Sequence, residues 1–145
     1  MVELLFSSSL IALVGAGEQP DTSPRRLTLI NSATNCTVAH LPFPSSVLAV
    51  HLNATRLVVV LEGRAFVYDL LSLELLDTVL TPTNTTGLAA LTPAAHAGAD
   101  NLLALPASAA EGHIAVHDCK QPRAVCEIRA HNLPLVRRLP PQPPE

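Results

Sequence analysis

The sequence is poor in aromatic and charged residues. It has no tryptophan, one tyrosine and three phenylalanines in 145 residues, its charged residues amount to 14%, and its net charge is −3. Proteins that bind single-stranded nucleic acid stack bases on aromatic rings and track the backbone with a basic groove. The sequence therefore predicts no nucleic-acid partner and no broad basic face for an anionic bilayer.

Motifs of enzymes and cofactor sites are absent as well. The sequence has no Gly-x-Ser-x-Gly elbow, no phosphate-binding glycine-rich loop and no His-Glu-x-x-His helix. Gly15, Ala16 and Gly17 lack the rest of a dinucleotide-binding fingerprint. We expect no catalytic residue, no cofactor and no enzymatic activity.

One short segment, residues 113–119, carries side chains that are common metal ligands. His113, His117 and Cys119 share parity in an extended chain, so they face one side of the predicted strand. At strand rise the two histidines stand about 13 Å apart, which is too far to share one zinc ion. We expect no metal site, and we assign these side chains to packing between neighbouring units or to solvent.

The cysteines are few, and none belongs to a C-x-x-C pair. Cys36, Cys119 and Cys126 are an odd number at irregular spacing. Such usage is typical of a reducing compartment. We therefore expect free, buried thiols in a cytosolic protein.

No segment has the pattern of a secretory signal or of a membrane span. Residues 10–16 are apolar, but Glu3 is the only charge before them and no Lys or Arg precedes them. No apolar run approaches the roughly 18 residues that cross a bilayer. We interpret residues 10–14 as a buried strand, and we expect the sequons at Asn35, Asn53 and Asn84 to matter only in a secreted protein.

The sequence is rich in hydrophobic residues, which make up 48% of it and occur in short segments. Residues 57–61 form an unbroken, valine-rich run, which is typical of a strand buried on both faces. Residues 46–52, 64–70 and 73–80 complete a predicted four-stranded antiparallel meander. Because such a meander cannot bury both faces alone, neighbouring parts of the chain must cover it.

Further strand patterns flank this meander, separated by polar turns and by turns with Gly or Pro. They fall at residues 2–6, 10–14, 25–31, 36–41, 87–91, 102–105, 113–118 and 124–130. The whole pattern predicts an all-β fold.

The strand units repeat along the chain. Three alternating strands end in Asn31, Asp69 and Asp118, which are 38 and then 49 residues apart. These spacings bracket the period of about 40–45 residues that is typical of WD-type propeller blades. Blade-like units at residues 1–41, 46–80 and 87–130 follow, and an ordinary β-sandwich of hairpins is the alternative.

Seven ordered blocks then carry a resemblance to a known family. They include SVLAVHLNATRLVVVLE at residues 46–62 and VYDLLSLELLDTV at residues 67–79, with residues 5–17, 23–31, 84–91, 103–108 and 126–135. These blocks resemble the PROPPIN family, the WIPI-type, autophagy-related WD-repeat proteins. The resemblance covers residues 2–135 and implies about three blades of a seven-bladed β-propeller, truncated at both ends.

The resemblance implies a phosphoinositide-binding membrane adaptor in autophagosome formation, which recognises PtdIns3P and PtdIns(3,5)P2. In the family, two neighbouring arginines of a Phe-Arg-Arg-Gly motif each neutralise one inositol phosphate, as a guanidinium does well. Val136-Arg137-Arg138-Leu139 lacks the glycine and is followed by two prolines. We expect no lipid-binding residue here, so headgroup binding belongs to intact relatives.

Residues 136–145 form a Pro-rich segment without a strand pattern, and we expect them to be disordered. A retained intron, a shifted frame or an incomplete gene model would leave such a tail. Transcripts that continue with further blades would support that hypothesis.

The resemblance also implies a protein partner. In the family, a Pro-Arg pair in a loop of the second blade helps to hold the lipid-transfer protein that works with these propellers. Pro24, Arg25 and Arg26 stand at the matching position, and a proline fixes the backbone so that an adjacent arginine projects toward a carboxylate. The alternative is a plain loop end with solvated arginines. Arg56 is a second exposed-looking cation, either a partner contact or a solvated strand start.

The sequence leaves two functions open. One is an autophagy adaptor that is cytosolic and peripheral to the phagophore assembly site, endosomes or vacuoles. The other is a lipid-blind protein-interaction module or a non-functional truncated product. In either case two apolar blade faces would stay open, which predicts marginal stability alone.

Overall fold

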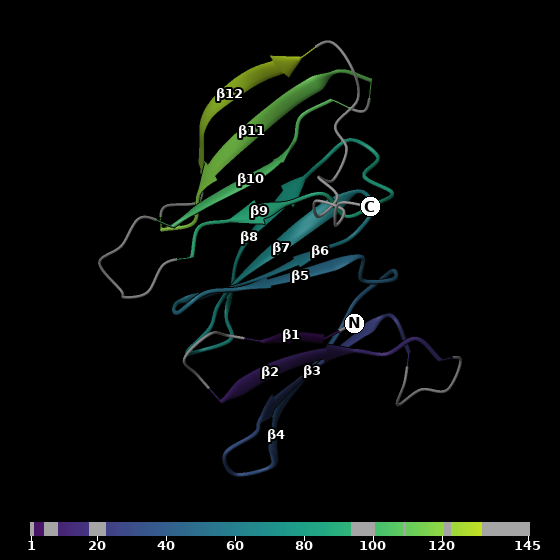
Figure 1. Cartoon of the computed structure of the whole chain (residues 1–145), viewed down its shortest axis with the longest axis vertical. Helices are drawn as coiled ribbons and strands as arrows, with labels where there is room; N and C mark the ends of the chain where they lie inside the picture. The colour runs from purple at the N-terminus through teal and green to yellow at the C-terminus, as the bar shows by residue number, and fades with distance from the viewer. Residues whose placement is uncertain are drawn as a thin grey trace, which may run out of the picture.

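The structure, a computed structural model, describes residues 2–4, 9–17, 23–93, 101–108, 110–120 and 123–131. All regular secondary structure in this part of the chain is β-strand, arranged in three four-stranded antiparallel sheets (Figure 1). The first sheet holds β1 Val2–Leu4, β2 Leu10–Val14, β3 Arg26–Asn31 and β4 Cys36–Pro42. The middle sheet holds β5 Ala49–Leu52, β6 Arg56–Val60, β7 Arg64–Asp69 and β8 Leu75–Leu80. The third sheet holds β9 Ala90–Leu91, β10 Leu102–Pro106, β11 Gly112–Asp118 and β12 Arg123–His131. The predicted all-β fold is confirmed.

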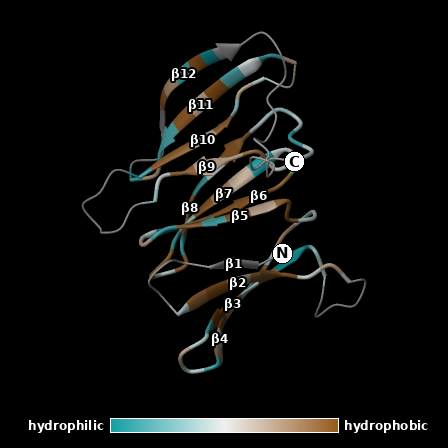
Figure 2. Cartoon of the chain, viewed as in Figure 1, coloured by the Kyte–Doolittle hydropathy of each residue, from teal (hydrophilic) through white to brown (hydrophobic). Residues whose placement is uncertain are grey.

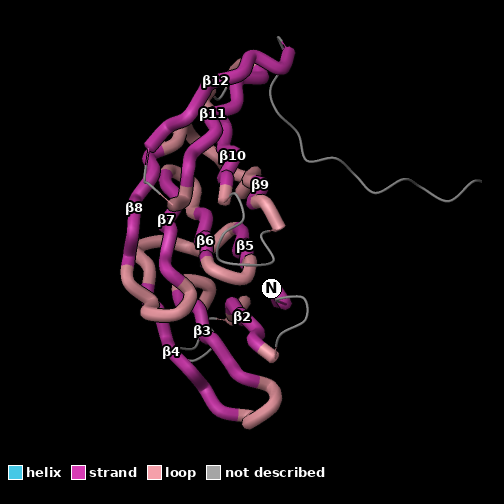
Figure 3. The backbone as a smooth tube through the Cα atoms, turned by 90° about the vertical axis from the view of Figure 1, so that its left-hand side faces the viewer, coloured by secondary structure: helices cyan, strands magenta, loops and turns pink. Residues whose placement is uncertain are grey.

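Each sheet is a meander whose strands lie side by side in chain order. The three sheets stack one above the other, with the middle sheet between the other two (Figure 1). In the side view of Figure 3 the fourth strands β4, β8 and β12 lie along one margin, and β2, β5 and β9 lie toward the other. The stack is therefore organised like neighbouring blades of a propeller.

Most predicted strands agree with the structure to within one or two residues, and two were predicted to begin three residues too early. β5 begins at Ala49 instead of residue 46, and β9 holds only Ala90–Leu91 instead of residues 87–91. β8 begins at Leu75 instead of residue 73, because Leu73 has a φ of 59° and ends the preceding turn. A left-handed backbone at a bulky residue breaks the extended conformation. Of the strand predicted at residues 2–6, residues 5 and 6 lie outside the described part.

The inner strand β6 is buried on both faces, as predicted. Leu57 and Val59 pack into a cluster with the first sheet, whereas Val58 and Val60 pack into a cluster with the third. All four are 0% exposed. The second strand of each sheet is strongly apolar, as the brown colour of β2, β6 and β10 shows (Figure 2). The middle sheet is thus the centre of two cores.

The recurring Asn or Asp at the end of the third strand has the same role in every sheet. The side-chain oxygens of Asn31, Asp69 and Asp118 each accept a hydrogen bond from the backbone N–H two residues later, at 3.0, 3.1 and 2.8 Å. Such bonds stabilise a tight turn locally. The sequence mark that indicated the repeat is therefore a turn cap between the third and fourth strands.

Gly87 lies in the turn before β9, and its backbone conformation favours glycine. Its φ is 66°, and a Cβ at this position would lie 2.8 Å from the Cβ of Leu48. We predict that Gly87→Ala lowers the free energy of unfolding by about 1–3 kcal/mol, measured by urea denaturation. Gly63 has nothing within 4 Å of its Cβ position, so Gly63→Ala should change stability by less than about 0.5 kcal/mol. Equal effects of the two substitutions would contradict the assignment.

Candidate partner-binding site

The predicted partner-binding residues form a tight turn directly before β3. The amide of Arg26 donates to the carbonyl of Ser23 at 3.2 Å, and the amide of Arg25 donates to the Ser23 hydroxyl at 3.2 Å. Pro24 is half-buried, and its ring fixes φ at the first central position of the turn. The sequence folds this way because Ser and Pro both favour a turn here.

This turn is docked on the linker that joins the first sheet to the middle sheet. The amide of Val47 donates to the carbonyl of Pro24, and the amide of Phe43 donates to the carbonyl of Arg25, both at 2.8 Å. Phe43 and Val47 are both buried. Four hydrogen bonds therefore hold the backbone of residues 23–26 in one conformation.

Aromatic rings anchor the linker in turn. The ring of Phe43 lies 5.5 Å from that of Phe66 and 6.4 Å from that of Tyr68, measured between centroids. The contact with Tyr68 is edge-to-face, a favoured geometry. Because Phe66 and Tyr68 belong to β7, the turn rests on the core between the first and middle sheets.

The three residues differ in exposure. Arg25 is exposed, whereas Pro24 and Arg26 are half-buried. A partner approaching this turn would thus meet the guanidinium of Arg25 first. The structure places Pro24, Arg25 and Arg26 together on one hydrogen-bonded turn. Its docking on residues 43–47 could not be predicted from the local sequence.

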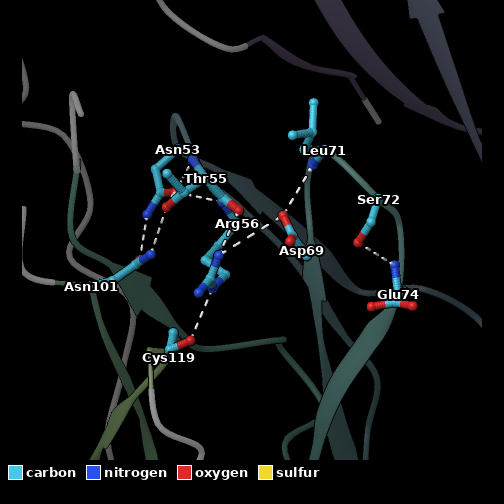
Figure 4. Close-up of polar contacts among 9 residues, drawn as sticks. All are labelled: Asn53, Thr55, Arg56, Asp69, Leu71, Ser72, Glu74, Asn101 and Cys119. Carbon is cyan, nitrogen blue, oxygen red and sulfur yellow. Dashed lines mark hydrogen bonds and ion pairs between the residues drawn. The ribbon is translucent and has the colours of Figure 1, made fainter. Parts of the chain in front are cut away.

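Arg56 is neither an exposed partner contact nor a solvated strand start, so both expectations were wrong. Its side chain is only 15% exposed. Nε donates to the backbone carbonyl of Cys119 at 2.9 Å, and Nη1 donates to the carbonyl of Thr55 at 2.9 Å (Figure 4). Nη1 also lies 4.0 Å from Oδ1 of Asp69. Arg56 therefore joins the middle sheet to the third sheet.

Two buried asparagines complete this junction, which sequence reasoning missed. Nδ2 of Asn53 donates to Oδ1 of Asn101 at 2.7 Å and to the carbonyl of Thr92 at 3.0 Å. Nδ2 of Asn101 donates to Oγ1 of Thr55 at 2.7 Å, and Oδ1 of Asn53 accepts from the amide of Arg56 at 2.8 Å (Figure 4). Both asparagines are 2% exposed. We call Asn53, Thr55, Arg56, Asn101 and the Cys119 carbonyl the inter-sheet clasp.

The three cysteines are free, but only one is buried. Cys119 is 3% exposed, whereas Cys36 and Cys126 are exposed, so the expectation of buried thiols was wrong for these two. Cys36 lies on β4 and Cys126 on β12, which are the outer strands of their sheets. Burial raises the pKa of the Cys119 thiol to about 11, and the charge of Arg56 opposes this only in part. Cys119 is therefore a packing residue with an unreactive thiol.

The two histidines of β11 make separate contacts. His117 lies beside Asp77 of β8, and burial lowers the pKa of its imidazole, partly offset by that carboxylate. His113 instead lies 3.1 Å from a carboxylate oxygen of Glu111 and 3.3 Å from one of Glu127. The predicted packing between units is confirmed for His117. Among the described residues no group of three or more His, Cys, Asp or Glu could hold a metal ion.

Two predictions concern membranes, one about an arginine pair and one about membrane-spanning segments. The arginine pair at Arg137 and Arg138 lies outside the described residues. Within the described part of the chain, no helix has the length and apolarity to cross a membrane.

Comparison with known proteins decides the family. The sequence model of the PROPPIN family matches residues 1–137. The chain belongs to the PROPPIN family. Autophagy-related protein 18b of Arabidopsis thaliana is 45% identical over 135 residues, which are 93% of this chain and 36% of that protein. Autophagy-related protein 18 of Komagataella pastoris is 45% identical over 106 residues, 73% of this chain and 19% of that protein.

Solved structures support the propeller fold of this PROPPIN chain. It superposes with a TM-score of 0.74 and 25% identity on a chain of the complex of KlAtg21 with the coiled-coil of AgAtg16, covering 90% of this chain and 42% of that one. The computationally designed Ika8 protein matches with a TM-score of 0.60 at 18% identity, over 92% of this chain and 37% of that one, and so shows the fold alone. This PROPPIN chain spans about a third of the plant relative and about a fifth of the yeast relative.

The inter-sheet clasp of this PROPPIN chain should contribute measurably to the free energy of unfolding. Asn53→Ala and Asn101→Ala each leave a buried polar group unpaired, so each should lower the free energy of unfolding by about 1–3 kcal/mol. Because the two amides bond each other, the double variant should show a coupling energy of about 0.5–3 kcal/mol in urea denaturation. Thr83→Ala, on an exposed turn, serves as the control. Additive effects of the two asparagine substitutions would contradict a shared network.

Proposed function

We propose that this chain is part of a PROPPIN-type autophagy adaptor and that its turn at residues 23–26 binds a protein partner. The proposed partner is the autophagy lipid-transfer protein that works with these propellers, held through Pro24, Arg25 and Arg26. The names of the relatives support a role in autophagy. The complex of KlAtg21 with a coiled-coil supports protein recognition by a similar fold.

The observation that carries this proposal is an exposed guanidinium on a backbone that is already fixed. The turn below Arg25 is held by two internal hydrogen bonds and by two more to the linker. A guanidinium binds a carboxylate through two parallel N–H donors, so its orientation matters. A preformed turn loses less conformational entropy on binding than a flexible loop. An acidic segment of the partner is the chemistry that fits.

We propose further that residues 1–135 form a partial propeller of three blade units followed by a Pro-rich tail, and that this stretch does not bind phosphoinositides by itself. Arg25 and Arg26 are adjacent, but one is exposed and the other half-buried, whereas headgroup recognition needs two arginines that each enter a pocket. Membrane association of the whole protein with phagophore, endosomal or vacuolar membranes would then depend on other parts of it. The alternative function is a lipid-blind interaction module.

Charge reversal at the turn tests the partner site. We expect Arg25→Glu to weaken binding to the purified lipid-transfer protein about tenfold or more, measured as Kd by biolayer interferometry. Arg25→Lys should show a smaller loss, because an ammonium cannot make the bidentate contact. Arg64→Glu is the matched control, since Arg64 is exposed next to the corresponding turn of the middle sheet. Unchanged binding of Arg25→Glu, or an equal loss with Arg64→Glu, would refute the site.

Liposome flotation tests the lipid part of the proposal. The 145-residue chain should float to the same low extent with phosphatidylcholine vesicles and with vesicles that also contain phosphatidylinositol 3-phosphate. Neutralising the doubly charged phosphate needs two arginines that each enter a pocket, and we propose that this stretch has no such pair. Recovery that rises only with the phosphoinositide would show that the chain carries a headgroup site of its own.

A further inference from the structure

Three hydroxyl residues of the chain stand directly before a proline, namely Ser23, Thr81 and Thr92. Proline has no amide hydrogen, so a protein kinase whose pocket offers no acceptor after the phosphorylated residue selects proline there. Some of these proline-directed kinases also bind a basic side chain at the third position after the hydroxyl residue. Ser23 has such a residue in Arg26, whereas the residues at that position after Thr81 and Thr92 are uncharged. The sequence pattern therefore favours Ser23 as a kinase substrate.

The structure keeps the other two hydroxyls from a kinase. Oγ1 of Thr81 is completely buried. Oγ1 of Thr92 accepts a hydrogen bond from the amide of Leu102 at 2.9 Å, and the carbonyl of Thr92 accepts one from Nδ2 of Asn53 at 3.0 Å. Because a phosphoryl group has to reach the hydroxyl oxygen itself, either threonine would have to leave its packed position first. Phosphorylation of Thr81 or Thr92 therefore requires local unfolding.

Ser23 is held much less firmly. Its hydroxyl accepts an exposed hydrogen bond from the amide of Arg25 at 3.2 Å, and its carbonyl accepts one from the amide of Arg26 at 3.2 Å. Both lengths are at the upper end of the range for N–H···O bonds. The bonds that dock the carbonyls of Pro24 and Arg25 on the linker are shorter, at 2.8 Å. Ser23 thus lies at the weakly held end of the turn, and it is the acceptor that a kinase reaches at the lowest cost.

We propose that Ser23 is the phosphorylation site of a proline-directed kinase and that its phosphorylation switches off the partner site at Arg25. In the transfer, the Ser23 hydroxyl oxygen forms a bond to the γ-phosphorus of ATP while the bond from that phosphorus to the β–γ bridging oxygen breaks. The hydroxyl proton passes to the catalytic base of the kinase, and ADP leaves. The switch rests on the proposed partner site, whereas the modification itself does not.

The switch follows from where the new charge stands. A phosphoserine carries a charge of about −1.5 to −2 at pH 7 and offers three strong acceptor oxygens. The Ser23 hydroxyl already accepts from the amide of Arg25, so the phosphate oxygens are placed to accept from this amide and from the Arg25 guanidinium. Such charge-assisted bonds are about twice as strong as neutral ones. The guanidinium is then paired within the chain, and a partner carboxylate meets a negative charge in its place.

Phosphate transfer to the folded, purified 145-residue chain tests the modification. ATP and a cyclin-dependent kinase bound to its cyclin should add one phosphate, and peptide mass spectrometry should place it on Ser23 and not on Thr81 or Thr92. Ser23→Ala should take up none. Arg26→Gln should lower kcat/KM of the transfer about threefold, since it removes an exposed ion pair with the kinase. Circular dichroism checks that each variant keeps its strands.

Three results would overturn the proposed phosphorylation site. They are no phosphate on Ser23, equal phosphorylation of all three hydroxyl residues in the folded chain, and a rate of transfer that Arg26→Gln leaves unchanged.

Binding before and after phosphorylation tests the switch. Biolayer interferometry with the purified lipid-transfer protein should show Kd rising about tenfold or more on phosphorylation of Ser23, and phosphatase treatment should reverse this. The same kinase treatment of Ser23→Ala should leave the Kd of that variant where it was before treatment. Complete phosphorylation of Ser23 with an unchanged Kd would overturn the switch and leave the partner site standing. An unmodified chain that does not bind the partner would overturn the partner site and the switch together.

Discussion

The structure depends on the two-sided burial of β6 (Arg56–Val60). Its four apolar residues are completely buried, two against each neighbouring sheet. Burying a valine or leucine side chain contributes about 1.5–3 kcal/mol relative to leaving it in water. A strand without a polar face must be covered on both sides, so the middle sheet requires the first and third sheets.

Apolar burial alone does not fix how one sheet is placed on the next, because the hydrophobic effect has no direction. Hydrogen bonds between buried groups do have direction, and an unpaired buried amide is costly. The bonds of Asn53 to Asn101 and of Arg56 to the Cys119 carbonyl are satisfied in one placement of the third sheet on the middle sheet. The inter-sheet clasp therefore determines the placement that the apolar residues stabilise.

The structural features that depend only on residues close together in the chain could be predicted from the sequence. Unbroken valine runs, alternating strands and the turn caps Asn31, Asp69 and Asp118 are local patterns, and the structure has them at nearly the predicted residues. The clasp could not be predicted because its partners are far apart: Asn53 and Asn101 are 48 positions apart in the sequence. Likewise, the left-handed backbone of Leu73 has no local signal, since leucine rarely adopts it.

Arg25 and Arg56 show why residue type alone does not assign a role. Both are arginines close to the start of a strand, and the sequence indicated a partner contact for each. The side chain of Arg56 lies between two sheets, where a backbone carbonyl of the third sheet accepts its Nε proton. Arg25 is exposed, and it is the carbonyl of this residue, not its guanidinium, that the linker binds. In the described part of the chain, the side chain of Arg56 joins the middle sheet to the third sheet, whereas Arg25 is exposed on a fixed turn, the position that we propose for a partner carboxylate.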